Sequence, residues 1–157
     1  MRVMQSLQPS FLTHTESKTR CRMKSYIQPF ERILASMEFC SLCGIDWSND
    51  QVQDIPELVD IKMLCERLAY WDCIEGSSFI PTKQALLEAT YYSRYDDTGE
   101  LVIKRLPNTR ILRYGPHDLH EYRGKFFPQL VKSLINIAKL PEGSLVIDPF
   151  CGSGTTN

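Results

Sequence analysis

Residues 144–156 have the sequence S-L-V-I-D-P-F-C-G-S-G-T-T, and this stretch decides which fold we expect. Residues 145–147 are a continuous apolar run, which is typical of a strand buried in a parallel sheet. The two glycines allow a tight turn and the close approach of a ligand, and the two threonines would begin a helix whose free amide groups attract an anion. The stretch therefore predicts a strand-to-helix turn around a ligand. Asp148 would lie at the carboxyl end of the strand, where open α/β sheets bind ligands.

A helix is predicted immediately before this strand. Between residues 128 and 139, apolar side chains recur at the i, i+3 and i+4 positions of one face, namely Leu130, Val131, Leu134, Ile135 and Ala138. Pro128 suits the first position of a helix, and the P-E-G sequence at 141–143 ends it. A helix followed by a strand of this kind fits the start of an α/β fold, although one strand and one helix cannot build a doubly wound sheet by themselves.

Two motifs in this region resemble those of a known family. The D-P-F-C-G-S-G-T-T sequence resembles motif I of the S-adenosylmethionine-dependent DNA amino-methyltransferases, the N-4/N-6 DNA methylases, which modify the exocyclic amine of adenine or cytosine. Upstream, H-E-Y-R-G-K-F-F-P-Q-L at 120–130 resembles motif X of the same family. The resemblance covers about residues 117–157. It implies that residues 116–157 begin a Rossmann-like methyltransferase sheet with S-adenosylmethionine as the cofactor.

The resemblance also implies which residues bind that cofactor. In the family, the motif I loop cradles the methionine part of the cofactor, and motif X closes over it from the other side. The matching positions are Lys125, Phe126, Pro128, Asp148, Pro149, Phe150, Gly152, Ser153, Gly154 and Thr155. Taken as residues alone, Phe150 also fits a core aromatic beneath the loop, and Lys125 also fits a solvated lysine at a helix start. His117 and His120 are assigned no catalytic role.

The family's catalytic motif is absent from this sequence. That motif is Asp, Asn or Ser, then Pro-Pro, then an aromatic residue that stacks on the flipped base. The sequence contains no Pro-Pro pair. In the order found here, motif X before motif I, the catalytic motif would follow residue 157. We therefore assign no catalytic residue and expect an N-terminal fragment ending at motif I that is inactive by itself. DNA would be the partner of the complete enzyme, and a complementary C-terminal half is a second candidate partner.

Two other interpretations stay open. The chain could be a non-catalytic DNA-binding or accessory module that carries a methyltransferase remnant. It could also be a fragment of a related RNA methyltransferase, because those enzymes use the same D-P-F-x-G-S-G sequence before a helix. The downstream sequence is the feature that would separate the DNA enzyme from the RNA enzyme.

The region before the motifs predicts two further parts. Residues 1–24 lack periodicity and are expected to be a flexible lead. Residues 25–115 are expected to form a small α+β module of helices plus a hairpin. Its predicted elements, in order, are a helix over about 26–39 ended by Gly44, a helix to about 70, a loop at 76–78, a helix beginning at Pro81, and strands at 101–103 and 111–114.

Composition limits the class of protein. The 157 residues are 43% hydrophobic and 24% charged, with a net charge of −1 and a sequence pI of about 6.3, so there is no global basic signature for nucleic-acid binding. No apolar run is long enough to span a bilayer, and the N-terminus has no signal-peptide core, so we expect a cytoplasmic location. The six cysteines are expected to be reduced. The lone C-x-x-C at Cys40 and Cys43 favours two half-buried thiols near a helix end, and no metal site is predicted.

Overall fold

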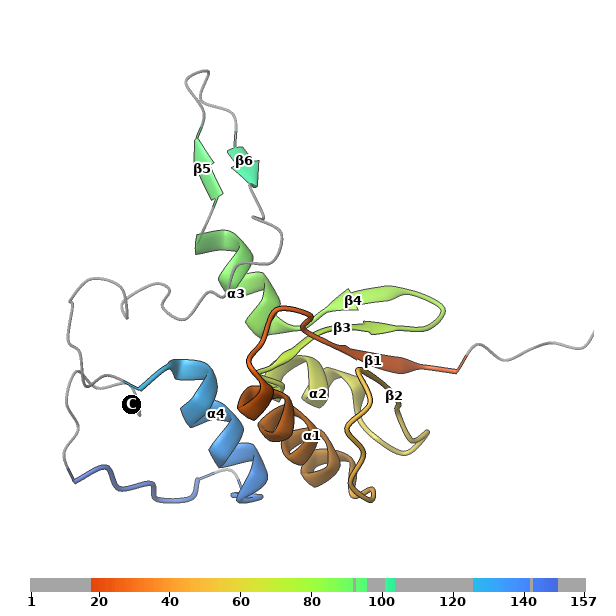
Figure 1. Cartoon of the computed structure of the whole chain (residues 1–157), viewed down its shortest axis with the longest axis vertical. Coiled ribbons are helices and arrows are strands. Elements are labelled where there is room, and N and C mark those ends of the chain that lie inside the picture. The colour runs from red at the N-terminus through yellow and green to blue at the C-terminus, as the bar shows by residue number, and fades with distance from the viewer. Residues whose placement is uncertain (1–17, 92, 96–100, 104–125, 142, 150–157) are drawn as a thin grey trace, which may run out of the picture.

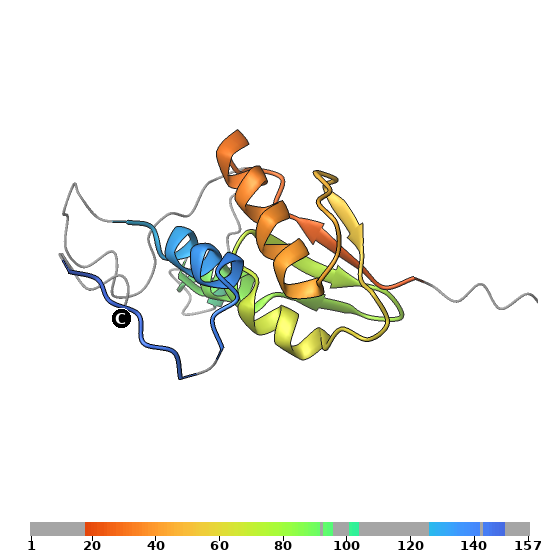
Figure 2. The same cartoon turned by 90° about the horizontal axis from the view of Figure 1, so that it is seen from below.

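The computed structural model describes residues 18–91, 93–95, 101–103, 126–141 and 143–149. These residues form a mixed α/β structure in which helices cover one side of a four-stranded sheet (Figure 1). The view from below shows the helical layer in front of the sheet (Figure 2).

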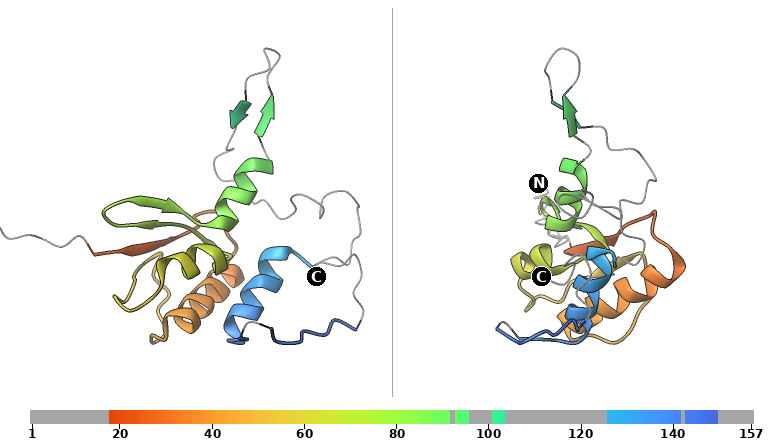
Figure 3. Two further views of the ribbon diagram at one scale, coloured as in Figure 1. Left: turned by 180° about the vertical axis from the view of Figure 1, so that it is seen from behind. Right: turned by 90° about the vertical axis from the view of Figure 1, so that its left-hand side faces the viewer.

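Every neighbouring pair of strands in the main sheet is antiparallel. The strands are β1 (Arg20–Met23), β2 (Val52–Asp54), β3 (Trp71–Glu75) and β4 (Phe79–Pro81), in the order β2-β1-β3-β4. A separate two-stranded sheet pairs β5 (Ser93–Tyr95) with β6 (Leu101–Ile103). The helices are α1 (Pro29–Cys43), α2 (Ile61–Arg67), α3 (Lys83–Tyr91) and α4 (Pro128–Ile137). Helix α4 lies beside α1 in all the views (Figure 3).

Helices α1 and α4 confirm two sequence predictions, because their ends carry local signals. Pro29 and Pro128 each occupy the first turn, where their missing N–H costs no hydrogen bond. The Gln28 N–H donates to the Glu31 carboxylate at 2.7 Å, which satisfies one unpaired donor at the start of α1. At the other end, Gly44 adopts φ 67°, a left-handed conformation that glycine accepts without strain.

An aromatic pair lies at the centre of the core between α1 and the sheet. The Phe39 and Trp71 ring centroids are 4.6 Å apart, and both side chains are fully buried. The Trp71 indole N–H donates to the Ala35 carbonyl at 3.0 Å, so its polar atom is satisfied inside the core. Burial of each such side chain contributes about 1.5–3 kcal/mol.

The prediction of a flexible lead up to residue 24 is wrong for Arg20–Met23. These residues form β1, an inner strand that pairs with both β2 and β3. Their exposure alternates, with Cys21 and Met23 buried, as a strand with one solvated face requires. Four residues are too few for that alternation to be recognised in the sequence. Residues 1–17 lie outside the described part of the chain.

The predicted helix up to about residue 70 is also corrected. Helix α2 ends at Arg67, and Trp71 belongs to β3. The amide groups of Ala69 and Tyr70 donate to the buried carboxylate of Glu38, at 3.1 and 3.0 Å. These two amides therefore donate to a side chain that is distant in the sequence, and not to the backbone carbonyls that they would bond in a longer helix.

Two further predictions were right in part. Residues 76–78 form the predicted loop, although the strands that it joins, β3 and β4, were missed. Pro81 ends β4, and the third helix begins at Lys83 after Thr82, whose Oγ1 accepts from the Ala85 amide at 3.2 Å. Strand β6 is confirmed, but its partner is β5. The predicted partner at 111–114 lies outside the described residues, as does the predicted module boundary at 115/116.

The predicted buried strand at 145–147 is wrong for this structure. The three side chains are exposed, Leu145 by 85% and Ile147 by 75%, and the segment has no strand conformation. A strand needs a neighbour for its backbone groups, and none of the described residues pairs with this segment. The parallel sheet that the motif implied is therefore not part of the described structure, whose main sheet is antiparallel.

Candidate functional site

Four of the ten predicted cofactor-binding residues are described by the structure. Phe126, Pro128, Asp148 and Pro149 can be placed, and the rest lie outside the described residues, namely Lys125, Phe150, Gly152, Ser153, Gly154 and Thr155. The site can therefore be examined from the motif X side and up to the first two positions of motif I.

Three of these residues line one groove of about 340 Å³ beside α4. Phe126 comes from the motif X segment, whereas Asp148 and Pro149 come from motif I. One predicted position of the motif X segment and two of motif I thus line the same groove. The groove is otherwise aliphatic and includes Leu130, Val131, Leu134, Ile135, Ala138, Leu140, Val146 and Ile147. Pro128 lies in the first turn of α4, so its role in the described structure is to start that helix.

The turn after α4 redirects the chain toward the groove. Lys139 and Gly143 adopt positive φ angles of 52° and 81°. The Ser144 amide and hydroxyl both donate to the Pro141 carbonyl, at 3.2 and 2.7 Å. These local bonds fix the direction in which residues 144–149 leave the helix.

The described residues fit part of an S-adenosylmethionine molecule. The Phe126 ring is 61% exposed at the groove, so it offers an apolar surface for a flat or aliphatic group. Asp148, a partly buried residue, lies on the same groove, and its carboxylate has the charge to attract an ammonium group. The aliphatic walls offer no hydrogen bonds for ribose hydroxyls. The groove as described therefore suits the apolar and cationic parts of the cofactor.

The opposite side of α4 carries polar groups that the sequence analysis did not identify. Asn136 donates to the Glu38 carboxylate at 3.1 Å and to the Arg67 carbonyl at 2.8 Å, and it accepts from the Arg67 guanidinium at 3.1 Å. Glu38 is fully buried, and this burial raises its pKa to about 6 although three hydrogen bonds oppose the shift. The one available signal was Glu38 itself, a charged residue at the end of the apolar stripe of residues 26–39.

A second buried polar cluster lies near the start of α4. Lys24 and Glu88 form an ion pair at 2.7 Å, with side chains only 2% and 4% exposed. The Lys24 ammonium also donates to the Ala69 carbonyl at 2.9 Å, and the amides of Gln84 and Gln129 donate to Glu88 at 2.9 and 3.1 Å. These contacts join the start of α4 to α3 and to Lys24, the residue that follows β1, whereas Asn136 fixes the other end of the helix.

Lys132 projects from the same helix close to both clusters. Partial burial lowers its pKa to about 8, while the carboxylates of Glu38 and Glu88 oppose that shift and the ammonium groups of Lys24 and Lys83 add to it. The amine has no catalytic partner among the described residues, so we assign it no chemical role.

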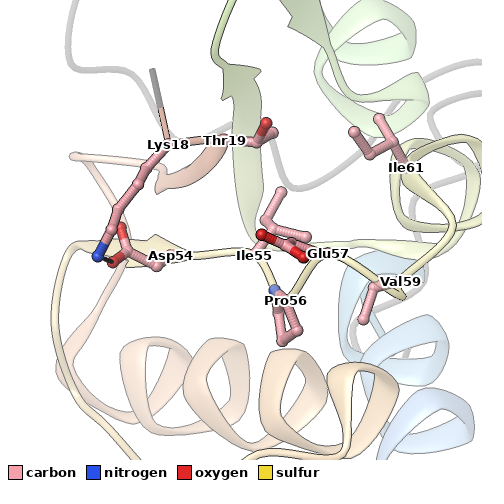
Figure 4. Close-up of a pocket in the computed structure, with 8 residues that line it drawn as sticks. All are labelled: Lys18, Thr19, Asp54, Ile55, Pro56, Glu57, Val59 and Ile61. Carbon is pink, nitrogen blue, oxygen red and sulfur yellow. Dashed lines mark hydrogen bonds and ion pairs between the residues drawn. The ribbon is translucent and has the colours of Figure 1, made fainter. Parts of the chain in front are cut away.

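A second hollow of about 520 Å³ lies at one end of the main sheet (Figure 4). Its rim includes the exposed ion pair between Lys18 and Asp54, 3.2 Å apart, and Ile55 lies at its base. Neither predicted motif contributes a residue to it. Exposed ion pairs of this kind contribute little stability, and we assign the hollow no function.

The cysteines of the C-x-x-C lie where the sequence predicted. Cys40 and Cys43 are half-buried free thiols in the last turn of α1. Burial raises the pKa of Cys43 to about 12, which keeps the thiol protonated. Among the described residues, no group of His, Cys, Asp and Glu side chains is placed to hold a metal ion.

Within the same part of the chain, no helix has the length and apolar character needed to cross a membrane.

Comparison with known proteins relates the chain to methyltransferases. It is 50% identical over 40 residues to the type II methyltransferase M.MjaII of Methanocaldococcus jannaschii, a stretch that is 26% of this chain and 7% of that protein. It is 45% identical over 31 residues to the tRNA (guanine(10)-N2)-dimethyltransferase of the same organism, covering 20% of this chain and 9% of the relative. The chain thus matches less than a tenth of either relative. No family model matches the chain, and no solved structure matches it.

Proposed function

We propose that residues 116–157 are the first part of the cofactor-binding domain of an S-adenosylmethionine-dependent DNA amino-methyltransferase. The observation that carries the proposal is the groove beside α4, because Phe126 of motif X and Asp148 of motif I both line it. The partial match to a type II methyltransferase supports the same assignment. In this proposal the complete enzyme transfers a methyl group to the exocyclic amine of adenine or cytosine.

The residues of this chain would bind and orient the cofactor. Asp148, on the groove, would attract the ammonium group of the cofactor's methionine part, and the Phe126 ring and aliphatic wall would exclude water from it. Gly152 and Gly154 would let the backbone approach the ligand closely. The cofactor, when bound, supplies a methyl group on a sulfonium, which is a strong electrophile. The target amine would be held by the Pro-Pro motif, which this sequence lacks.

An RNA methyltransferase is the second candidate. The match to a tRNA guanine dimethyltransferase favours it, and that relative also belongs to the transferases that act on an exocyclic amine. The groove would serve either substrate, because it concerns the cofactor alone. The two candidates therefore differ in residues outside the groove.

The test of the proposal supplies the missing half and measures the product. The chain is co-expressed with a downstream methyltransferase half and incubated with tritiated S-adenosylmethionine and an equal mixture of DNA and tRNA. We expect N6-methyladenine or N4-methylcytosine in DNA, and we expect Asp148→Ala to abolish it. Labelled methylguanine in tRNA alone would reject the DNA enzyme in favour of the RNA enzyme.

The chain alone provides the matched control. We expect it to leave both nucleic acids unlabelled and to bind S-adenosylmethionine too weakly for calorimetry. Micromolar affinity corresponds to about 8 kcal/mol, more than part of a pocket should supply. Labelling by the chain alone, above the level of a Gly152→Asp variant, would contradict the assignment of catalysis to a motif outside this sequence.

A further inference from the structure

One carboxylate oxygen inside the N-terminal module accepts hydrogen bonds from three side chains. Oε1 of Glu88, on α3, accepts from the Lys24 ammonium at 2.7 Å, from the Gln84 amide at 2.9 Å and from the Gln129 amide at 3.1 Å. Glu88, Lys24 and Gln129 are 3%, 2% and 4% exposed. A buried hydrogen bond to an ionised acceptor is strong, because no water competes for the donor. Helix α4 is therefore bound to α3 at a single, well-defined atom.

The acceptor atom is itself held in place from the module side. The backbone amide of Lys24 donates to the Tyr70 carbonyl at 3.1 Å, and its ammonium also donates to the Ala69 carbonyl at 2.9 Å. Gln84 lies one turn before Glu88 on the same helix. The cation and the carboxylate thus have fixed positions in the module, and Gln129 reaches them from a separate helix.

Gln129 stands in the first turn of α4, which has no side-chain cap of the usual kind. Phe127 is the N-cap residue and supplies no side-chain hydrogen bond, and Pro128 follows it. Within this turn, the Leu130 amide donates to the Phe127 carbonyl at 3.0 Å. A polar N-cap side chain normally stabilises the first turn of a helix. The bond from Gln129 to a carboxylate that is 41 residues away in the sequence stabilises it here instead.

Phe126 leaves the chain directly before this turn and lines the groove beside α4. It stands three residues before Gln129, and its ring is 61% exposed. Asp148 and Pro149 reach the groove from the segment that follows α4. A ring with this exposure takes its position mainly from the backbone that carries it. Movement of the first turn would therefore move one wall of the groove relative to the other.

We propose that Gln129 is a positioning residue for the cofactor site, because its bond to Oε1 of Glu88 fixes the first turn of α4 and thereby the place of Phe126 at the groove. The inference rests on the proposed function, which takes the groove as the binding site of S-adenosylmethionine. Lys24 and Glu88 belong to neither motif, yet they act on cofactor affinity through Gln129. The N-terminal module is thus part of the support of the cofactor site.

The first experiment compares two buried glutamines in the chain by itself. Gln129→Met removes the amide and keeps the length of the side chain. Gln53→Met is the matched control, since Gln53 is 5% exposed and its amide donates to the Ser48 carbonyl at 3.0 Å, on β2 and away from α4. We expect Gln129→Met to speed amide hydrogen exchange at Leu130 about tenfold. Gln53→Met should leave that exchange unchanged.

Fluorine NMR measures the position of the ring in the same variants. The chain is labelled with fluorinated phenylalanine, and Phe126→Leu identifies the signal of Phe126. Gln129→Met should shift or broaden this signal, whereas Gln53→Met should not, even where both lower the urea midpoint equally. This readout needs neither cofactor nor methyl transfer.

An exchange of the two polar groups tests whether the bond itself is responsible. Glu88→Gln combined with Gln129→Glu moves the carboxylate to α4 and keeps one carboxylate within reach of Lys24. Each single change should disturb the Phe126 signal, and the double change should restore most of it. If the exchanged protein does not fold, the comparison of Gln129→Met with Gln53→Met decides the question by itself.

The last experiment uses the chain co-expressed with a downstream methyltransferase half. Gln129→Met should raise the KM for S-adenosylmethionine roughly threefold to tenfold and leave kcat within about twofold. Gln53→Met should change neither. A disturbed Phe126 signal in the chain alone, combined with a complex that neither binds nor uses S-adenosylmethionine, would reject the proposed function and leave the positioning of Phe126 by Gln129 intact.

Three results would overturn the positioning role. The first is a Phe126 signal and a Leu130 exchange rate that Gln129→Met leaves unchanged. The second is an equal disturbance from Gln53→Met, which would make the effect a general loss of stability. The third is an active complex in which Gln129→Met lowers kcat alone or changes no kinetic constant, because the place of Phe126 would then not determine cofactor affinity.

Discussion

The N-terminal module and the C-terminal segment differ in what their sequences reveal and in how well their apolar side chains are buried. Residues 18–91 carry no recognised motif, yet they close a core around Phe39 and Trp71. Residues 126–149 carry both recognised motifs in part, yet they leave several large apolar side chains exposed, among them Leu134, Leu145 and Ile147. The residues of a motif are those that bind a ligand, whereas the residues of a closed core are those that stabilise the fold. The four predictions below test that contrast, from the largest expected effect to the smallest.

Removal of a core side chain should separate the two regions most strongly. Trp71→Ala should lower the free energy of unfolding by about 3–5 kcal/mol, because it leaves a cavity and removes the bond to Ala35. Ile147→Ala, in the exposed segment, should change it by less than about 0.5 kcal/mol. Urea unfolding, followed by far-ultraviolet circular dichroism because the signal does not depend on Trp71, measures the free energy of unfolding of both variants. A large loss from Ile147→Ala would mean that the C-terminal segment has a core of its own.

Removal of the buried ammonium group of Lys24 should cause the next largest loss of stability. Lys24→Met leaves the Glu88 carboxylate buried without its ion partner and should cost about 3 kcal/mol. Because Glu88 also accepts from Gln129, hydrogen exchange in α4 should accelerate as well. Lys18→Met breaks an exposed pair and should cost less than about 1 kcal/mol. If α4 kept its protection in Lys24→Met, the helix would not depend on this cluster.

The pH dependence of stability should reveal the two titratable groups beside α4. Burial raises the pKa of Glu38 in the folded chain from the ordinary glutamate value of 4.5 to about 6, so the folded chain holds this proton more tightly than the unfolded chain. The raised pKa therefore adds about 2 kcal/mol to the free energy of unfolding below pH 4.5. This stabilisation is lost as the pH rises through 6. The Lys132 pKa is lowered from 10.5 to about 8, so stability should rise again between these values.

Two substitutions assign these slopes. Glu38→Gln should flatten the acid slope alone, and Lys132→Met should flatten the alkaline slope alone. Urea unfolding at one-unit pH steps measures the profiles. A stability that rises between pH 4.5 and 6 in the unsubstituted chain would contradict the sign derived for Glu38.

Loss of a helix cap should produce the smallest effect. The Thr82 hydroxyl accepts from the Ala85 amide and donates to the Trp71 carbonyl at 2.7 Å, so Thr82→Ala should cost about 1–2 kcal/mol. Ser144→Ala removes an exposed hydroxyl bond in the C-terminal segment, and it should cost only a few tenths of a kcal/mol. Equal midpoints for the two variants would show that Thr82 does not contribute as a buried cap.

The candidate site was predictable from the sequence to the extent that its residues stand in short motifs. Phe126 and Asp148 were identified because they stand in short motifs, and the groove brings both together. Glu38, Lys24 and Asn136 were not identified, because their partners lie between 31 and 98 residues away along the chain. Hydrogen bonds over such separations have no local sequence pattern.

The sequence by itself determined both ends of α1 and the start of α4. Pro29, Gly44 and Pro128 set ends of α1 and α4, because a missing amide hydrogen or a left-handed φ acts within one turn of chain. Only the tertiary structure decided that Arg20–Met23 is an inner strand and that α2 stops at Arg67. It also decided which face of α4 is buried. Strand pairing and burial depend on groups that chain folding brings from a distance, and periodicity reports only that a face is apolar, not what covers it.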